Sequence, residues 1–167
     1  MRIKLLKYHP DAVIPFKKHD SDFCYDLVAV SEEEVAPNVW KYGLGWGMQI
    51  ERGMETITKL LYPYNAFPDF SLDFNRFPLN LSIDIRPRSS IYKTGMVLCN
   101  SQGTVDEEYT NEISVIFYHV NKDMPRYKIG ERVAQMKIGF TLPCTFSEVD
   151  ELDETDRGLG GFGSTGR

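Results

Sequence analysis

Several features that would narrow the function quickly are missing from this sequence. It has only three cysteines, Cys24, Cys99 and Cys144, and they are too far apart to form a Cys-x-x-Cys zinc or redox motif. No apolar run approaches the roughly 18 residues that a membrane span requires, and the N-terminus lacks the apolar core of a signal peptide. We therefore expect free thiols, no membrane contact, and a location in the cytoplasm, in the nucleus of a eukaryote, or in the host cytoplasm for a virus.

An excess of basic residues and an internal repeat are also missing. The formal net charge is -5, which argues against a nonspecific nucleic-acid binder, because such a protein needs a broad basic surface to displace counterions. A few well-placed arginines and a divalent cation could still hold a small polyphosphate, since the local field matters more than the total charge. We therefore expect no nucleic-acid partner, and a small anionic ligand stays open.

What the sequence does contain is the composition of an all-β protein. Two Trp, nine Tyr and ten Phe accompany 13 Gly and 9 Pro, which is typical of short strands joined by tight turns. The clearest predicted strand is Leu79 to Ile85, where apolar and polar residues alternate. Three glutamates, 32–34, are expected to end the second strand. The other predicted strands are 2–7, 25–30, a bent strand at 39–50, 96–99, 113–120 and 133–140.

The 167 residues fit a single domain followed by a tail. We expect a β domain over residues 1–147 and, over 148–167, an acidic linker and a glycine-rich arm with too few apolar residues to form a core. Residues 51–77 combine aromatics with prolines and are interpreted as a long inserted loop. The loop either covers a flank of the domain or binds a protein partner.

Two short segments carry residues suited to chemistry on a phosphorylated ligand. The segment from Arg86 to Ser90 offers guanidinium and hydroxyl donors for an anion, with a solvated turn as the alternative. Asp106 stands on a predicted hairpin arm, three residues before Tyr109. A carboxylate there could deprotonate water, and the ring could stack on a sugar and leave no room for a 2′-hydroxyl. The alternative is a hairpin with a polar tip.

Three further segments are polar where the surroundings are apolar or glycine-rich. Asp26 lies among apolar neighbours and needs an Arg or a hydrated metal as partner. Gln135 lies in an apolar strand and needs a ligand phosphate or a neighbouring backbone group. The tail from Arg157 to Gly166 lets backbone amides approach an anion, but it lacks the Gly-Lys-Ser/Thr ending of a P-loop, and a flexible linker is the alternative.

Taken together, and in their order along the chain, the five segments resemble the five motifs of the trimeric dUTPases. The resemblance implies a jelly-roll-like β-barrel of the β-clip type, a homotrimer with shared active sites, and a mobile C-terminal arm that closes over a site. It also implies hydrolysis of dUTP to dUMP and pyrophosphate with Mg²⁺. The matching residues, besides Asp26, are Pro87-Arg88-Ser89, Gly103-Thr-Val-Asp-x-x-Tyr109, Gly130-Glu-Arg-Val-Ala-Gln135 and Arg157-Gly-x-Gly-Gly-Phe-Gly-Ser-Thr-Gly166.

Carried over position by position, the resemblance implies a role for each of these residues. Asp106 would activate the attacking water, and Asp26 would hold Mg²⁺ through water or brace a catalytic Arg88. Tyr109 would lie against the deoxyribose, and Phe162 would stack over uracil in the closed arm. The remaining expected substrate contacts are Ser89, Ser90, Asn100, Gly103, Thr104, Val105, Ser114, Gln135, Arg157, Gly163, Ser164 and Thr165.

The chain departs from the family pattern at three places. Phe23 and Cys24 replace a small pair before Asp26, and Asn111 stands where Gly is usual. The spacing between Asp26 and the arginine turn exceeds the usual one by about twenty residues, which we assign to the loop at 51–77. Two rival functions follow from the same segments: a dCTP deaminase of the same fold superfamily, and a regulatory binding protein gated by a nucleotide.

Overall fold

The computed structural model describes residues 2–51, 80–141, 144–156 and 158, and none of these is α-helical. The all-β prediction is confirmed, whereas the expectations for residues 52–79 lie outside the described residues. No helix in the described residues is long and apolar enough to cross a membrane. The elements are β1 Arg2–Lys7, β2 Tyr25–Val28, β3 Ser31–Ala36, β4 Val39–Gly43, β5 Trp46–Glu51, β6 Asn80–Pro87, the 3-10 helix η1 Ser89–Lys93, β7 Met96–Leu98, β8 Gly103–Val105, β9 Ser114–His119 and β10 Arg132–Thr141.

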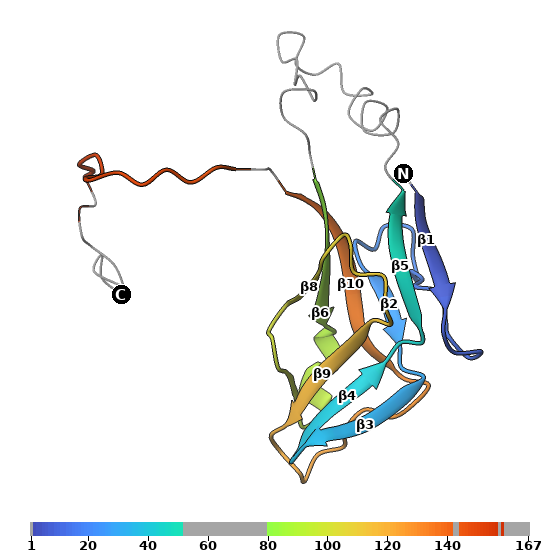
Figure 1. Ribbon diagram of the computed structural model, residues 1–167. Coiled ribbons are helices and arrows are strands. Elements are labelled where there is room, and N and C mark those ends of the chain that lie inside the picture. Colours follow the sequence, from blue (N-terminus) through green and yellow to red (C-terminus); the bar gives the residue numbers. More distant parts are fainter. Residues whose placement is uncertain (1, 52–79, 142–143, 157, 159–167) are drawn as a thin grey trace.

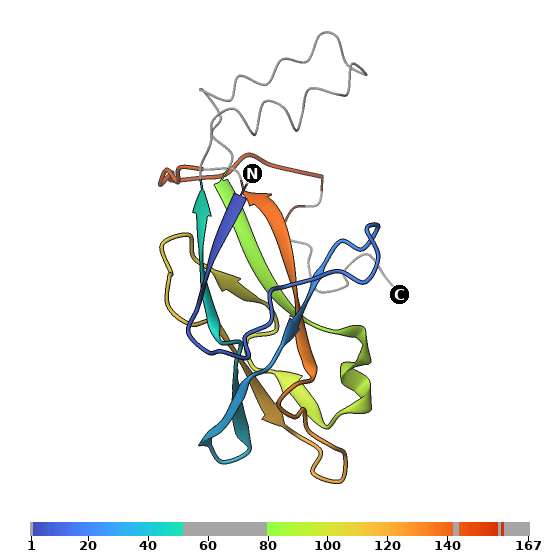
Figure 2. The same ribbon diagram turned by 90° about the vertical axis from the view of Figure 1, so that its right-hand side faces the viewer.

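The described strands form three antiparallel groups (Figures 1 and 2). One four-stranded sheet has the order β2-β10-β6-β8 and another has the order β3-β4-β9-β7, while β1 pairs with β5. Within the first sheet β10 lies between β2 and β6, so that Gln135 is opposite both Asp26 and Arg86. This register brings three segments that are far apart in the sequence to one end of a sheet.

The three groups of strands share one apolar core. Side chains from β2, β6 and β10 meet side chains from β4, β5, β7 and β9 there. The largest fully buried side chains are those of Trp46, Tyr42 and Phe117, and the ring of Tyr42 lies edge-on to that of Phe117 at a centroid distance of 5.9 Å. Removal of this apolar surface from water is the main force that holds the sheets together.

The prediction that the glutamates 32–34 end a strand was wrong, because they lie inside β3. This strand is at the edge of its sheet, where charged side chains are compatible with strand structure because one flank faces solvent. Glu32 also forms a bidentate ion pair with Arg126, at 2.8 and 3.1 Å, and the Arg126 guanidinium stacks over Trp40 at 3.7 Å from the ring centroid.

The predicted bent strand at 39–50 is two strands in two different groups. β4 belongs to the sheet with β3 and β9, and β5 pairs with β1. The chain changes direction at Gly45, whose φ of 74° lies in the left-handed region that glycine tolerates. A Cβ atom at this position would also lie 2.7 Å from Val30 Cγ2, so that both the backbone angle and the close packing require glycine.

After β10 the chain leaves the sheets. Residues 144–156 are exposed throughout, contain no strand, and run away from the strands (Figure 1). Cys24, Cys99 and Cys144, all of them described, are free thiols, as expected from their spacing.

Candidate active site

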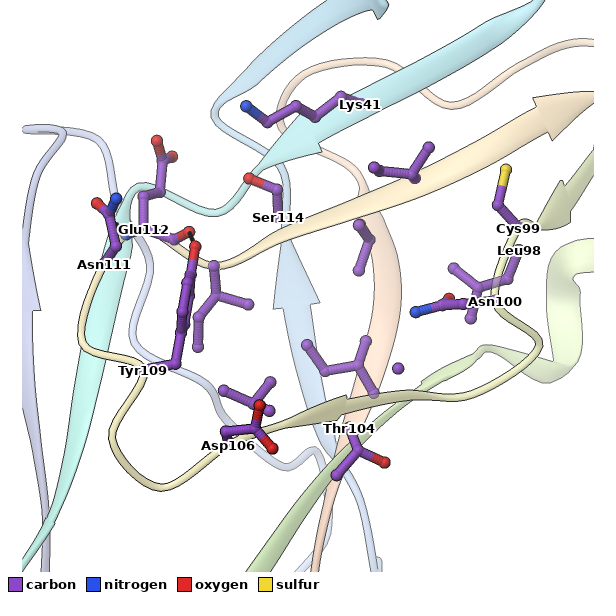
Figure 3. Close-up of a pocket in the computed structure, with 16 residues that line it drawn as sticks. Lys41, Leu98, Cys99, Asn100, Thr104, Asp106, Tyr109, Asn111, Glu112 and Ser114 are labelled. Carbon is purple, nitrogen blue, oxygen red and sulfur yellow. Dashed lines mark hydrogen bonds between the residues drawn. The ribbon is translucent and has the colours of Figure 1, made fainter.

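The hairpin that carries Asp106 forms one wall of a cavity of about 550 Å³ (Figure 3). The predicted paired hairpin is wrong, because β8 pairs with β6 whereas β9 pairs with β4 and β7, in another sheet. We keep the word hairpin for residues 100–114, which connect the two sheets, and residues of both β8 and β9 line the cavity. All seven residues that the sequence predicted on this hairpin are therefore found around a single space: Asn100, Gly103, Thr104, Val105, Asp106, Tyr109 and Ser114.

Local backbone contacts shape the cavity. The Asp106 carbonyl accepts a hydrogen bond from the Tyr109 N–H at 3.0 Å, which closes a turn and leaves both side chains at the rim of the cavity. A Cβ atom on Gly103 would lie 2.9 Å from Asn100 Nδ2, so glycine permits the close approach of β8 to the Asn100 amide. A backbone edge beside an amide side chain is suited to recognition of a planar base with mixed donors and acceptors.

Tyr109 is held at the cavity by its hydroxyl group. The residue is 45% exposed, and the hydroxyl donates to the backbone carbonyl of Glu112 at 2.9 Å (Figure 3). Asp106 is exposed as well, so water can reach its carboxylate. The hairpin thus places an accessible carboxylate, that of Asp106, beside the aromatic ring of Tyr109. These are the two residues that the sequence singled out.

A second set of predicted residues surrounds the segment 86–90, which we call the arginine turn. β6 ends at Pro87, and Arg88 precedes η1 with an extended backbone. Its Nε donates to Asp26 Oδ1 at 2.8 Å, and its Nη1 donates to Ser90 Oγ at 3.3 Å. These contacts fix the orientation of the guanidinium, a group that binds phosphate through parallel hydrogen bonds.

Asp26 has a second arginine partner that was not predicted from the sequence. Arg132 Nη1 donates to Asp26 Oδ2 at 2.9 Å, so each oxygen of a carboxylate that is only 15% exposed accepts from a guanidinium. Arg132 is 106 residues from Asp26 along the chain. The sequence indicated that Asp26, which has apolar neighbours, needs a cation as partner. It did not indicate which of the arginines would bind it.

Gln135 completes this set through a backbone contact. Its Nε2 donates to the Pro87 carbonyl at 2.8 Å, which is one of the two partners that the sequence left open. A cavity of about 440 Å³ lies over these groups. Ser90 instead lines a neighbouring cavity that shares Arg88 and Arg132. The residues that line the first cavity include Lys18, Asp22, Asp26, Arg88, Ser89, Arg132 and Gln135.

The predicted residues thus divide into two groups within one chain. The cavity around Asp106 and the cavity around Arg88 have no lining residue in common. Five further predicted contacts lie outside the described residues: Arg157, Phe162, Gly163, Ser164 and Thr165.

The described residues contain no cluster of three or more His, Cys, Asp or Glu side chains that could hold a metal ion. The oxygens of Asp26 accept from two guanidinium groups, so this carboxylate does not fit the role of a direct metal ligand. Mg²⁺ at nucleotide sites is held by substrate phosphates and water with one or two carboxylates. The donor set of this chain fits an ion that binds mainly to a polyphosphate ligand.

Known proteins resemble this chain in sequence and in fold. The dUTPase family model matches residues 76–166. A protein of Picosynechococcus named deoxyuridine 5′-triphosphate nucleotidohydrolase is 33% identical over 167 residues, which is 99% of both chains. The protein of the same name from Helicobacter pylori is 33% identical over 99% of this chain and 97% of its own.

A solved structure gives the same result for the fold. The dUTPase of Staphylococcus bacteriophage 80alpha with dUPNHPP superposes with a TM-score of 0.71 at 17% identity, over 99% of each chain. At this identity the likeness concerns the fold alone. Together with the family match and the two full-length relatives, it leads to one conclusion: the chain belongs to the dUTPase family.

Proposed function

We propose that this member of the dUTPase family hydrolyses dUTP to dUMP and pyrophosphate, with Asp106 as the base. The observation that supports this most directly is the cavity that Asp106 and Tyr109 share with Asn100 and Gly103. Such a cavity offers space for the uracil ring and an aromatic surface for the deoxyribose. The Asp106 carboxylate would then lie where the phosphate chain starts. The relatives from Picosynechococcus and Helicobacter pylori carry this activity in their names.

The reaction requires one proton transfer and one displacement. Asp106 orients a water molecule and accepts its proton as the water oxygen attacks the α-phosphorus of dUTP. The bond from that phosphorus to the oxygen that bridges it to the β-phosphorus breaks, and pyrophosphate leaves with this oxygen. When bound, Mg²⁺ would neutralise phosphate charge. Because the Asp26 oxygens accept from Arg88 and Arg132, Asp26 would act on the ion only through water.

The other predicted residues would bind and orient the substrate. Arg88 and Ser89 would hold phosphate oxygens, and Gln135 would keep the turn in place through its contact with the Pro87 carbonyl. Asn100 and the backbone of residues 103–105 would recognise uracil, while Ser114 lines the same cavity. Ser90 would act through Arg88, because its hydroxyl accepts from that guanidinium.

We further propose that the active site is assembled in a homotrimer. Asp106 and Arg88 serve two separate cavities in one chain, yet an attack on a bound triphosphate needs both groups at one substrate. A hairpin from one chain and an arginine turn from its neighbour would meet this need, and the glycine-rich arm at 157–167 would close the site against water. We also propose a cytosolic or nuclear location, in which free thiols persist.

The test is pyrophosphate release from dUTP with Mg²⁺, with UTP, dTTP and dCTP as competing substrates. We expect turnover of dUTP, little turnover of UTP or dTTP, and no ammonia from dCTP. In Asp106→Asn, kcat should fall by about 10²- to 10⁴-fold, because the amide cannot accept the proton. Binding of a non-hydrolysable dUTP analogue should be retained. Full activity of this variant would exclude Asp106 as the base, and ammonia release would indicate a deaminase.

A further inference from the structure

Tyr109 is a half-exposed ring whose position depends on a neighbouring residue. Its hydroxyl donates to the Glu112 carbonyl at 2.9 Å, on the return side of the same hairpin (Figure 3). With 45% of the residue exposed, packing alone leaves the ring room to change rotamer. The orientation of the ring therefore depends on how firmly the Glu112 backbone is held.

The backbone beside Glu112 is held by Ile113, whose N–H donates to the Trp46 carbonyl at 3.0 Å and whose carbonyl accepts from the Leu44 N–H at 3.0 Å. Glu112 adds a contact of its own side chain. Its carboxylate Oε1 accepts from the Gly45 N–H at 2.9 Å in a partly buried position, a charge-assisted bond that is stronger than a neutral one. A Cβ atom on Gly43 would lie 2.6 Å from the same oxygen. The glycine at the end of β4 therefore leaves the space through which the carboxylate reaches the bend between β4 and β5.

The N-terminal segment holds the hairpin at the same bend. The Tyr8 hydroxyl donates to the Thr110 carbonyl at 2.9 Å, and the Tyr8 N–H donates to the Gly45 carbonyl at 2.8 Å. A Cβ atom on Gly47 would lie 2.8 Å from the Asn111 carbonyl, so the hairpin also packs closely on β5. We name the contacts of Tyr8, Gly45 and Glu112 the Glu112 clamp.

Resting on the proposed function, we propose that Glu112 is a positioning residue for sugar discrimination. Its carboxylate attaches the hairpin to Gly45, and its carbonyl fixes the Tyr109 ring against the cavity. A 2′-hydroxyl is a small group, and a pocket excludes it sterically only when the wall beside it cannot move. Loss of the clamp releases the ring, admits ribonucleotides and weakens the hold on deoxyribonucleotides.

The experiment compares kcat and KM for dUTP and UTP in four variants. Glu112→Ala removes the carboxylate bond of the clamp to Gly45 and leaves the Tyr8 contacts in place. The ratio of kcat/KM for UTP to that for dUTP should rise about tenfold, with KM for dUTP changing more than kcat. Glu112→Gln keeps an acceptor oxygen and should return the ratio to within about threefold of wild type. Glu108→Ala removes an exposed carboxylate of the same hairpin and should behave like wild type.

Tyr109→Phe makes the test independent of the stability of Glu112→Ala, because it removes only the hydroxyl and keeps the ring. It should also raise the UTP to dUTP ratio, with a thermal midpoint close to that of wild type. Normal dUTP hydrolysis by wild type, with a ratio within about twofold of wild type in both Glu112→Ala and Tyr109→Phe, would overturn the clamp. A wild-type protein that does not hydrolyse dUTP would instead contradict the proposed function, so the two failures are distinguishable.

Discussion

The Asp26 carboxylate holds two arginine side chains in position. It accepts from Arg88 at 2.8 Å and from Arg132 at 2.9 Å, which holds two guanidinium groups at one cavity despite their mutual repulsion. One negative charge between two positive ones leaves a net positive charge facing the cavity. The arrangement suits a polyphosphate better than a monophosphate, because several negatively charged oxygens then meet two oriented cations.

The first prediction concerns Asp26→Asn, which removes the charge and keeps the size. The amide keeps one neutral acceptor oxygen and presents an NH₂ donor to the other arginine, so the bridge between Arg88 and Arg132 is lost. KM for dUTP should therefore rise about tenfold, while affinity for dUMP, which lacks the outer phosphates, changes little. Asp22→Asn is the matched control, because Asp22 lines the same cavity but accepts from the His19 N–H and from neither arginine. Equal effects of the two variants on KM would show that general charge, not the bridge, is responsible.

At the residue level, local patterns named the residues that line the cavity around Asp106, but they missed one of the residues around Arg88. The spacing of three residues was interpreted as an extended arm that brings Asp106 and Tyr109 to one cavity. Both residues line one cavity, but a turn joins them, closed by the bond from the Tyr109 N–H to the Asp106 carbonyl. Arg132 and Glu112 were not assigned, since their partners lie 106 and 67 residues away. A contact of this kind depends on sheet register and chain crossing, which the sequence does not display directly.

Among the elements, the bend between β4 and β5 is held by contacts on several sides. Gly45 accepts through its carbonyl from the N–H groups of Tyr8 and His9, and it donates to Glu112. Its positive φ and the crowding around its α-carbon both exclude a side chain. The bend therefore couples the N-terminal segment, the change of sheet and the hairpin of the cavity.

The second prediction compares two glycines with positive φ. Gly130 has a φ of 85° and nothing lies within 4 Å of the place that a Cβ would take, whereas Gly45 has a φ of 74° and a Cβ there would lie 2.8 Å from His9 Cβ. Gly130→Ala should cost about 1 to 2 kcal/mol of unfolding free energy from backbone strain alone. Gly45→Ala should cost about 3 kcal/mol or more, because overpacking is added.

Urea unfolding of both variants measures the difference between them. An unfolding free energy for Gly45→Ala equal to or above that for Gly130→Ala would show that the surroundings of Gly45 relax freely, contrary to the close packing described at the bend.

The elements themselves were largely predictable, and the exceptions have physical reasons. β1 and β6 follow alternation of apolar and polar residues, and in β6 the alternate side chains of Ile83 and Ile85 are buried in the core. The glutamates of β3 were misassigned because strand propensity disfavours charge, whereas an edge strand with a paired Glu32 accepts it. The glycine-rich pattern around Gly45 predicted a bent strand. It could not predict that the chain passes from one sheet to another there, because this depends on which strands pair.

On the scale of the whole molecule, buried phenols make stability depend on alkaline pH. Burial raises the pKa of Tyr42 and of Tyr127 above the ordinary 10.0, although Arg126 and Arg88 respectively oppose the rise. A raised folded-state pKa means that the fold favours the neutral phenol. The resulting stabilisation is complete below about pH 10 and is lost as the pH rises through the folded-state pKa values.

The third prediction is therefore a decline in the urea midpoint above about pH 10. Tyr127→Phe should flatten this decline, because one buried phenol no longer has to ionise. Tyr92→Phe is the control, since Tyr92 is 72% exposed and gains nothing from burial. A pH dependence that is identical in the Tyr127→Phe variant and in wild type would assign the alkaline loss to other groups.

Whether the two cavities belong to one active site is the central question for the assembled protein. The hairpin with Asp106 and the turn with Arg88 share no lining residue within one chain. A dUTPase that works as proposed must bring them together between chains. Closed rotational symmetry can bring the two cavities together, because each chain then contributes its hairpin to the site shared with one neighbour and its arginine turn to the site shared with the other.

The most direct test is to mix two inactive variants, Asp106→Asn and Arg88→Ala, in one assembly. If the sites are shared between chains, a random mixture contains about a quarter of sites with an intact Asp106 from one chain and an intact Arg88 from the next. We predict that co-expressed chains with two different tags, purified through both tags in turn, recover a substantial fraction of wild-type dUTP hydrolysis. Co-purified mixed assemblies that stay as inactive as the separate variants would contradict a site built from two chains.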